Sequence, residues 1–223
     1  MRQQWIDLVY IHWRFNPQVV QALLPEGLEV DTFDGSAWVG LIPFSMRNIG
    51  LAHGPAVPYL GSFSEVNVRT YVRVNDQPGV WFFSLDVDRL LPAFVARTTY
   101  KLPYCWGDTT HMRHGDKLVT EVKRKWPHEV RASRLEVQIG DGCVATDLDV
   151  FLSARWGLFS KSRNGLRYAP VEHEPWPLRE AELISVDDTL VCAAGLPQPD
   201  GQPLVRFSDG VSVRIGLPHR VRS

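Results

Sequence analysis

The side chains best suited to chemistry alternate along residues 62–74. Glu65, Asn67, Arg69, Tyr71 and Arg73 occupy every second position, with valines and a threonine between them. This period of two predicts a β-strand with one polar and one apolar face. A polar face usually meets water, but in a closed barrel one face of every strand points inward. In the second case Arg69 and Arg73 suit a carboxylate, and Glu65 suits proton transfer.

A second group of reactive side chains lies in residues 96–104. This segment contains Arg97, Tyr100, Lys101 and Tyr104. A desolvated lysine near another cation has a lowered pKa and can form Schiff bases with carbonyl compounds. The alternative is an ordinary solvated lysine on a loop, because most lysines are exposed.

The histidines do not form a metal-binding motif. His111 and His114 are three residues apart, which places them on opposite faces of a strand. No nearby Cys, Asp or Glu completes a zinc set, so we expect structural or surface histidines. Glycine-rich nucleotide motifs, the Gly-x-Ser-x-Gly elbow and Cys-x-x-Cys pairs are also missing from the sequence. We therefore expect neither a metal nor another cofactor.

Composition and charge argue against several classes of function. The chain has 223 residues, with 24 basic and 25 acidic side chains. Nucleic-acid binding needs clustered positive charge, so we expect no nucleic-acid partner. No apolar run approaches the roughly 20 residues that span a bilayer, so we expect no membrane association. Three widely spaced cysteines and an N-terminus without a signal-peptide pattern favour the cytoplasm.

Strands dominate the elements that must position these side chains. The 8 tryptophans and 16 prolines favour short β-elements around a large core. Hairpins over residues 62–87 and 104–126 are the clearest. The Asp34-Gly35 turn predicts another hairpin, whose second strand Pro43 restricts to an edge or a bulge. Further strands are expected over residues 5–13, 28–33, 37–46, 130–139, 158–161, 166–171 and 178–186, with two more near the C-terminus.

Helices are expected at three places. Asn16 and the proline after it predict a short helix, because Asn caps helix N-termini and Pro fits the first turn. Thr146 begins a capping box and a helix over residues 146–156. A third helix is expected over residues 90–100. The sequence therefore predicts one β-dominated α+β domain over residues 1–223.

Longer motifs resemble a bacterial family catalogued as domain of unknown function 2071. They lie at residues 31–44 (DTFDGSAWVGLIPF), 63–72 (FSEVNVRTYV), 79–86 (GVWFFSLD), 96–104, 151–156 (FLSARW) and 173–178 (HEPWPL). The family is similar to the acetoacetate decarboxylase-like superfamily. That resemblance implies a curved, largely antiparallel β-barrel or cone around a central cavity, a few flanking helices and a homo-oligomer.

The resemblance also implies a set of site residues. In acetoacetate decarboxylase a lysine forms a Schiff base with a β-keto acid, and a neighbouring lysine lowers its pKa. An arginine and a glutamate complete that pocket. By motif position, Arg14 resembles the arginine and Glu65 the glutamate. Tyr104 occupies the Schiff-base position, and Lys101 lies three residues earlier.

Three hypotheses about function stay open. The first is a cofactor-independent lyase-, isomerase- or hydrolase-like enzyme for a small organic acid or carbonyl compound, with Glu65, Tyr104 and Lys101 as catalytic candidates. The candidate substrate-binding residues are Arg14, Asn67, Arg69, Tyr71, Arg97 and Tyr100. The second is a non-catalytic protein that binds or senses a small ligand. The third is a structural or interaction protein with an accidental cavity.

Overall fold

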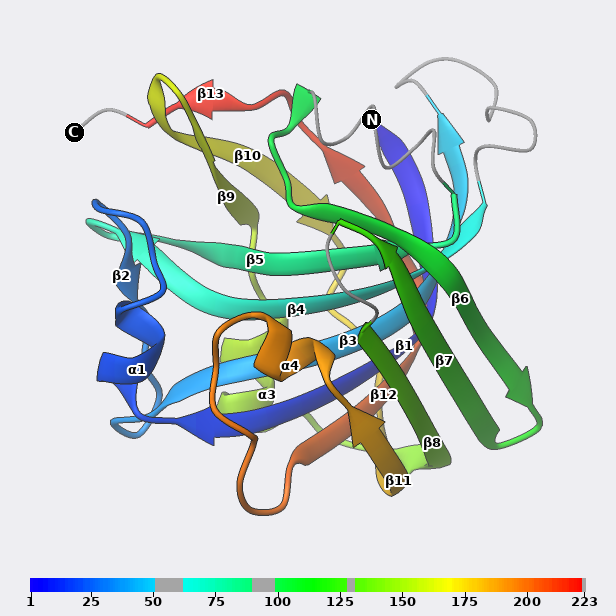
Figure 1. The fold of residues 1–223 in the computed structure, drawn as a ribbon. Coiled ribbons are helices and arrows are strands. Elements are labelled where there is room, and N and C mark those ends of the chain that lie inside the picture. Colours follow the sequence, from blue (N-terminus) through cyan, green and yellow to red (C-terminus); the bar gives the residue numbers. More distant parts are fainter. Residues whose placement is uncertain (51–61, 90–98, 128–130, 222–223) are drawn as a thin grey trace.

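The computed structural model describes residues 1–50, 62–89, 99–127 and 131–221 (Figure 1). A curved, mostly antiparallel sheet of 13 strands dominates these ranges. The strands are β1 (Arg2–Phe15), β2 (Glu29–Val30), β3 (Ala37–Gly50), β4 (Phe63–Val74), β5 (Gln77–Val87), β6 (Tyr104–His114), β7 (Lys117–Trp126), β8 (Arg131–Gly142), β9 (Gly157–Ser162), β10 (Gly165–His173), β11 (Leu178–Asp188), β12 (Leu204–Ile215) and β13 (His219–Arg220). The helices are α1 (Pro17–Gln21), α3 (Asp147–Ser153) and α4 (Leu190–Ala193).

Strand pairing within these ranges closes the sheet into a ring. The order runs β1–β3–β4–β5–β6–β7–β8–β11–β12 and returns to β1. Along part of their length, β5 also pairs with β9 and β12 with β10, so the sheet forks at both strands. The predicted β-dominated α+β fold is therefore confirmed, as a forked ring rather than a regular barrel (Figure 1).

The fork gives β1, β3 and β4 two buried faces. Val66 and Val68 of β4 pack in a core with residues of β7 and β8. Tyr71 of the same strand packs in a second core, with residues of β9 and β10. Because both faces are covered, β3 is apolar almost throughout, whereas a half-solvated strand would alternate. The two faces of β4 thus line two different interiors. These valines face one of them, and the polar side chains face the other.

A bulge in β1 explains how a proline fits inside the sheet. The pairing of β1 with β3 shifts register between Ile6 and Ile11, opposite Pro43. Asp7 in this bulge has φ 52, the left-handed conformation that extra strand residues often take. Proline lacks an N–H, so it fits best where the hydrogen-bond ladder is interrupted. Pro43 was predicted to lie at an edge or a bulge, and it lies at a bulge.

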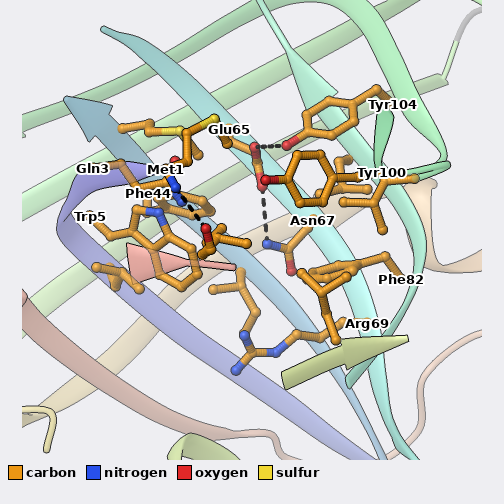
Figure 2. Close-up of a pocket in the computed structure, with 17 residues that line it drawn as sticks. Met1, Gln3, Trp5, Phe44, Glu65, Asn67, Arg69, Phe82, Tyr100 and Tyr104 are labelled. Carbon is orange, nitrogen blue, oxygen red and sulfur yellow. Dashed lines mark hydrogen bonds between the residues drawn. The ribbon is translucent and has the colours of Figure 1, made fainter. Parts of the chain in front are cut away.

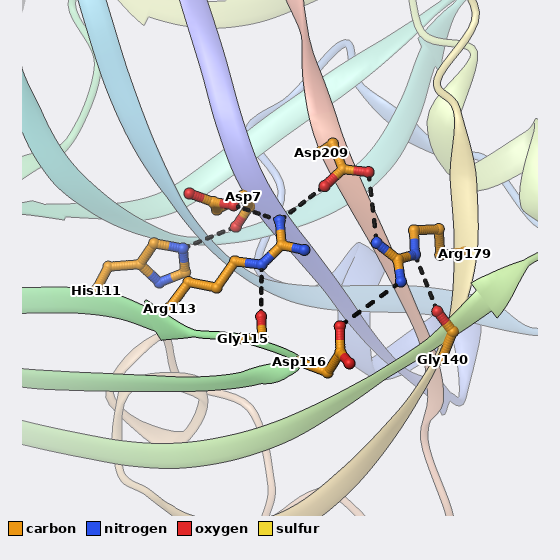
Figure 3. A network of polar contacts seen from close by, with 8 residues as sticks. All are labelled: Asp7, His111, Arg113, Gly115, Asp116, Gly140, Arg179 and Asp209. Carbon is orange, nitrogen blue, oxygen red and sulfur yellow. Dashed lines mark hydrogen bonds and ion pairs between the residues drawn. The ribbon is translucent and has the colours of Figure 1, made fainter.

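A polar network ties the bulge to β6, β11 and β12 (Figure 3). His111 bonds the Asp7 carbonyl at 2.7 Å, and burial lowers the pKa of His111 to about 4. Arg113 pairs with Asp7 at 3.1 Å and with Asp209 at 2.7 Å. Arg179 approaches Asp209 at 3.7 Å. Both arginines have carboxylate partners. The neutral His111 donates from Nε2 to the Asp7 carbonyl and accepts at Nδ1 from the Thr120 hydroxyl at 2.8 Å, so we interpret this cluster as structural.

The two capped helices begin as predicted. The Asn16 side chain accepts a hydrogen bond from the Gln18 backbone N–H at 2.8 Å. Thr146 caps α3 with a complete capping box. That helix ends at Ser153, before the predicted residue 156, because Ala154 leaves helical geometry at ψ 70 and the chain then enters β9. No helix in the described ranges is long and apolar enough to cross a membrane.

Two other expected elements differ in extent. The strand expected over residues 28–33 is reduced to β2, because the turn at Asp34-Gly35 starts early, with Phe33 already bridged to Ser36. Both turn residues have positive φ, so the tight turn is confirmed. The predicted pairing of the two flanking strands is wrong beyond the Phe33–Ser36 bridge, because β2 pairs with β4 and not with β3. The helix expected over residues 90–100 falls mainly on residues 90–98, which lie outside the described residues.

Candidate functional site

The polar face of β4 forms one wall of a cavity of about 60 Å³ (Figure 2). Glu65, Asn67 and Arg69 of β4 line it, together with Tyr100 and Tyr104. The rest of the wall is mostly apolar, with residues such as Trp5, Leu8, Ile42, Phe44, Phe82 and Leu158. A small, largely apolar space with a few polar groups suits one small molecule better than a nucleotide or a polymer.

Alternation along β4 brings the polar residues into this interior. Glu65 is 2% exposed, Asn67 3% and Arg69 9%. Arg73, at the end of the strand, is instead exposed and pairs with Glu29 at 3.3 Å. The polar side chains in the middle of β4 therefore point inward, as the barrel alternative predicts. Arg73 at the end of the strand does not.

Glu65 is a buried carboxyl held by neutral groups. Asn67 Nδ2 donates to Oε1 at 3.5 Å, and the Tyr104 hydroxyl donates to Oε2 at 3.2 Å. Burial raises the pKa of Glu65 to about 8, against the smaller opposite effect of these two hydrogen bonds. The nearby Asp86 charge raises this pKa further. The Glu65 carboxyl is therefore mainly protonated at neutral pH.

Tyr104 and Tyr100 reach the cavity from the start of β6 and the residues before it. Parallel pairing of β5 with β6 sets Tyr104 beside Leu85, within reach of Glu65 on the next strand. Burial raises the pKa of Tyr104 well above 10, and Glu65 and Tyr100 raise it further. Burial also raises the pKa of Tyr100. Both phenols are therefore hydrogen-bond donors at neutral pH.

Arg69 is a buried cation whose hydrogen-bond acceptors are neutral. Its Nη2 donates to the Tyr71 hydroxyl and to the Leu152 carbonyl, each at 3.2 Å. Its guanidinium carbon lies 5.7 Å from the Tyr10 ring centroid and 5.6 Å from that of Tyr71. Among the described residues no carboxylate pairs with it, and its buried Nε has no hydrogen-bond partner. Aromatic faces stabilise a cation without neutralising its charge.

Further hydrogen bonds hold the Tyr71 hydroxyl, which accepts from Arg69. The Tyr71 hydroxyl donates to the Leu152 carbonyl at 2.7 Å and lies 2.6 Å from His12 Nε2. Because the Tyr71 proton is used on Leu152, His12 Nε2 must be the donor to Tyr71. Burial lowers the pKa of His12 well below 6.5, and the Arg69 charge lowers it further. The neutral imidazole thereby holds the Tyr71 oxygen toward Arg69.

The predicted residue Asn67 lies between Glu65 and Arg69 on the polar face of β4. Its Nδ2 serves Glu65, and its buried Oδ1 has no hydrogen-bond partner within the described ranges. Trp5, on the opposite wall, also has a buried indole N–H without a partner there. Buried polar groups in folded proteins are nearly always satisfied. Two residues that line the cavity thus carry a polar atom without a partner in the described ranges.

Four predicted residues do not line this cavity. Tyr71 is fully buried and instead accepts a hydrogen bond from Arg69. Arg14 is exposed and lies with its guanidinium 4.9 Å from the Trp38 ring centroid. Lys101 is exposed, and its φ of 59 turns the chain between cavity-lining Tyr100 and Leu102. Arg97 lies outside the described residues.

No lysine of this chain is buried where it could act as a nucleophile in the cavity. The sequence contains five lysines, and all of them are in the described ranges and exposed: Lys101, Lys117, Lys123, Lys125 and Lys161. Within those ranges, no group of three His, Cys, Asp or Glu side chains is arranged to hold a metal ion.

Sequence reasoning missed His12 and Tyr10. They lie two residues apart on β1, so their shared face follows from strand alternation. Both are buried on the same side as Arg69, and their rings stack 6.2 Å apart. The signal was present in the predicted strand over residues 5–13, but an isolated His and Tyr among apolar residues carry no motif.

The fold is that of the acetoacetate decarboxylase-like proteins. Acetoacetate decarboxylase from Legionella pneumophila superposes with a TM-score of 0.70 at 13% identity, covering 99% of this chain and 88% of that one. An acetoacetate decarboxylase-like enzyme from Sphingomonas wittichii RW1 gives 0.69 at 19% identity, covering 100% and 93%. The enduracididine biosynthesis enzyme MppR, complexed with pyruvate, gives 0.65 at 14% identity, covering 98% and 89%.

The chain belongs to the DUF2071 family, described as "uncharacterized conserved protein", whose model matches residues 2–212. The uncharacterized protein YqjF of Bacillus subtilis (strain 168) is 35% identical over 210 residues, covering 93% of this chain and 87% of YqjF. The resemblance predicted from the sequence motifs is confirmed.

Proposed function

We propose that this protein is an enzyme that transfers protons on a small organic acid or carbonyl compound bound in the cavity. The observation that carries the proposal is the placement of Arg69 and Glu65 on one buried strand face. Burying a charge without a partner costs several kcal/mol. A substrate carboxylate is the partner that the Arg69 guanidinium lacks among the described residues, and its charge would offset that cost.

Glu65 has the properties of a general acid–base group. Its pKa of about 8 lies near neutral pH, where a carboxyl group both gives and takes a proton readily. The protonated carboxyl also avoids repelling an anionic substrate. In this proposal Glu65 exchanges a proton with the substrate, and Tyr104 or Tyr100 donates a hydrogen bond to the oxygen where negative charge develops.

The proposed chemistry differs from Schiff-base catalysis. No lysine supplies an amine nucleophile to the cavity, because all five lysines are exposed. The Met1 amino group, from a residue that lines the cavity, donates to the Ile215 carbonyl at 2.7 Å. The proposal therefore assigns no catalytic role to Lys101 and leaves Arg14 and Arg97 outside the site. The pyruvate complex of MppR, a protein of the same fold, supports small keto acids as the first probes.

Proton exchange in D₂O tests this proposal without knowledge of the full reaction. Pyruvate, acetoacetate and 2-oxobutyrate are incubated with the protein, and loss of the proton signal next to the carbonyl group is followed by NMR. We expect catalysed exchange with the wild-type protein and at least a 100-fold loss with Glu65→Gln. Glu121→Gln, an exposed change on β7, is the matched control and should exchange as the wild type does.

The same samples separate the enzyme from a ligand-binding or sensing protein. Saturable binding of a keto acid without exchange under single-turnover conditions would support the non-catalytic alternative. Exchange that survives Glu65→Gln would overturn the assignment of Glu65. An absence of both binding and exchange across the panel would count against both functions.

A further inference from the structure

A group of arginines lies far from the cavity, where β9, β10 and β13 meet. Register pairing sets Arg167 of β10 directly opposite Arg220 of β13. Like charges at directly opposed positions of an antiparallel pair destabilise it. Arg163, in the turn between β9 and β10, lines the same hollow. Three cations thus share one small surface depression.

The described residues do not neutralise these cations. No carboxylate in the described ranges forms an ion pair with Arg163, Arg167 or Arg220. Arg167 Nη2 donates to the Pro218 carbonyl at 2.8 Å, which anchors the side chain, but its buried Nε has no partner there. Asp76 lines an adjoining hollow that also contains Arg220, yet no ion pair joins the two.

We propose that this hollow binds the phosphoryl group of a small phosphorylated molecule. A phosphate monoester carries up to two negative charges and three terminal oxygens, so it matches three guanidinium groups better than a carboxylate does. Asn164 offers an amide at the rim. The hollow has a volume of about 520 Å³ and is open, which leaves space for the organic part of the ligand.

This site is independent of the proposed function. None of the residues that line the hollow, Ser162, Arg163, Asn164, Arg167 and Arg220, lines the cavity. Failure of the keto-acid experiment therefore leaves this proposal standing, and the reverse is also true.

Calorimetric titration at constant ionic strength tests the site, with inorganic phosphate, glycerol 3-phosphate and glycerol as probes. We expect saturable binding of both phosphates and none of glycerol. Arg167→Gln and Arg220→Gln should each weaken phosphate binding about 10-fold or more, because each removes a charged hydrogen-bond donor from the hollow. Tighter binding of glycerol 3-phosphate would point to an organic ester, and equal binding to free phosphate.

Lys161→Gln provides the matched control. It removes one positive charge from β9, but strand alternation places Lys161 on the face opposite Ser162. We expect less than about a 2-fold change in affinity, because the lysine does not line the hollow. An equal loss in Lys161→Gln would show non-specific charge attraction and overturn the proposal. So would the absence of saturable phosphate binding to the wild-type protein, shown folded by circular dichroism.

Discussion

Two buried arginines with nearly equal exposure have opposite surroundings. Arg124 of β7 is 7% exposed, and its Nε and Nη2 both donate to Asp86 at 2.6 Å. Arg69 of β4 is 9% exposed and donates only to a phenol and a carbonyl. Asp86 lies opposite Val66, on the face of β4–β5 that points away from Arg69.

These two arginines show how a structural charge differs from a functional one. Burial alone does not distinguish the two arginines, and neither does residue type. The difference is whether the chain supplies the counter-ion. A cation paired within the chain contributes to the fold, whereas a cation with only neutral acceptors among the described residues remains available for a ligand.

Removal of Arg124 should destabilise the folded protein far more than removal of Arg69. Arg124→Gln leaves the buried Asp86 carboxylate without its ion-pair partner, which costs about 3–5 kcal/mol of unfolding free energy. Arg69→Gln removes a charge that has no counter-ion in the described ranges, so the free energy of unfolding should change by less than about 1 kcal/mol or rise. Urea denaturation of both variants measures the difference.

The matched control is the double variant Asp86→Asn/Arg124→Gln, in which no charge is left alone. It should recover part of the stability lost in Arg124→Gln. Equal destabilisation by Arg69→Gln and Arg124→Gln would show that Arg69 has a structural counter-ion, and the contrast between the two sites would be wrong.

The second prediction concerns the pH dependence of stability. The pKa of Glu65 is about 8 in the folded protein and close to its ordinary value of 4.5 in the unfolded chain. Between these values the folded state holds a proton that the unfolded state has released. Stability should therefore fall as the pH rises from about 4.5 to 8, by at most about 1.4 kcal/mol per pH unit.

Glu65→Gln removes this titration and isolates its contribution. The difference in unfolding free energy between the variant and the wild type should grow in favour of the variant from pH 5 to pH 8, and then level off. Urea denaturation at several pH values provides the measurement. A difference that stays constant with pH would place Glu65 in a solvated environment.

The third prediction concerns the anion affinity of the cavity at high pH. As the pH rises through about 8, Glu65 becomes negative and opposes the binding of a carboxylate. The affinity for pyruvate should therefore fall several-fold between pH 7 and pH 9, at a rate of up to about 10-fold per pH unit. NMR titrations with wild type and Glu65→Gln test this, and an equal fall in both proteins would assign the titration to another group.

A smaller effect is expected from the residues that hold Arg69. His12→Phe removes the hydrogen bond to the Tyr71 oxygen and should weaken pyruvate binding by about 3- to 10-fold, as for one neutral hydrogen bond. His12→Gln retains a donor and should lose less. Equal losses in both variants, accompanied by equal losses of stability, would indicate a packing role only.

Lys101 should contribute little to either ligand binding or stability. Lys101→Gln should leave ligand affinity unchanged and stability within about 0.5 kcal/mol, because the side chain is exposed. Borohydride trapping with pyruvate, read by peptide mapping, should give no specific adduct on Lys101. A specific adduct would show that amine chemistry has moved to this residue.

Much of the fold could be predicted from the sequence. The period of two along β4 defined its polar and apolar faces, and the positive φ values at Asp34-Gly35 agree with the predicted turn. Long-range pairing was beyond prediction. The contact of Tyr104 with Glu65 depends on the parallel pairing of β5 with β6, which no local pattern encodes.

The same limit applies to the candidate arginines. Arg69 and Arg73 share a face by alternation, yet one is buried and the other is exposed, because Arg73 lies at the strand end beside β2. Arg14 also follows the cavity-facing alternation of β1 and lies beyond the enclosed part. Sequence spacing gives the face of a residue, while the position of the cavity along the strand comes only from tertiary structure.

The proposed function depends on Arg69 as the anion-binding group of the cavity. Its most direct test is an NMR titration of wild type, Arg69→Gln and Glu121→Gln with pyruvate, acetoacetate, 2-oxobutyrate and the uncharged amide of pyruvate. We predict saturable binding of at least one carboxylate, weakened about 10- to 100-fold by Arg69→Gln and unchanged by Glu121→Gln, with little binding of the amide. Equal carboxylate affinity in wild type and Arg69→Gln, or tighter binding of the amide, would contradict the claim.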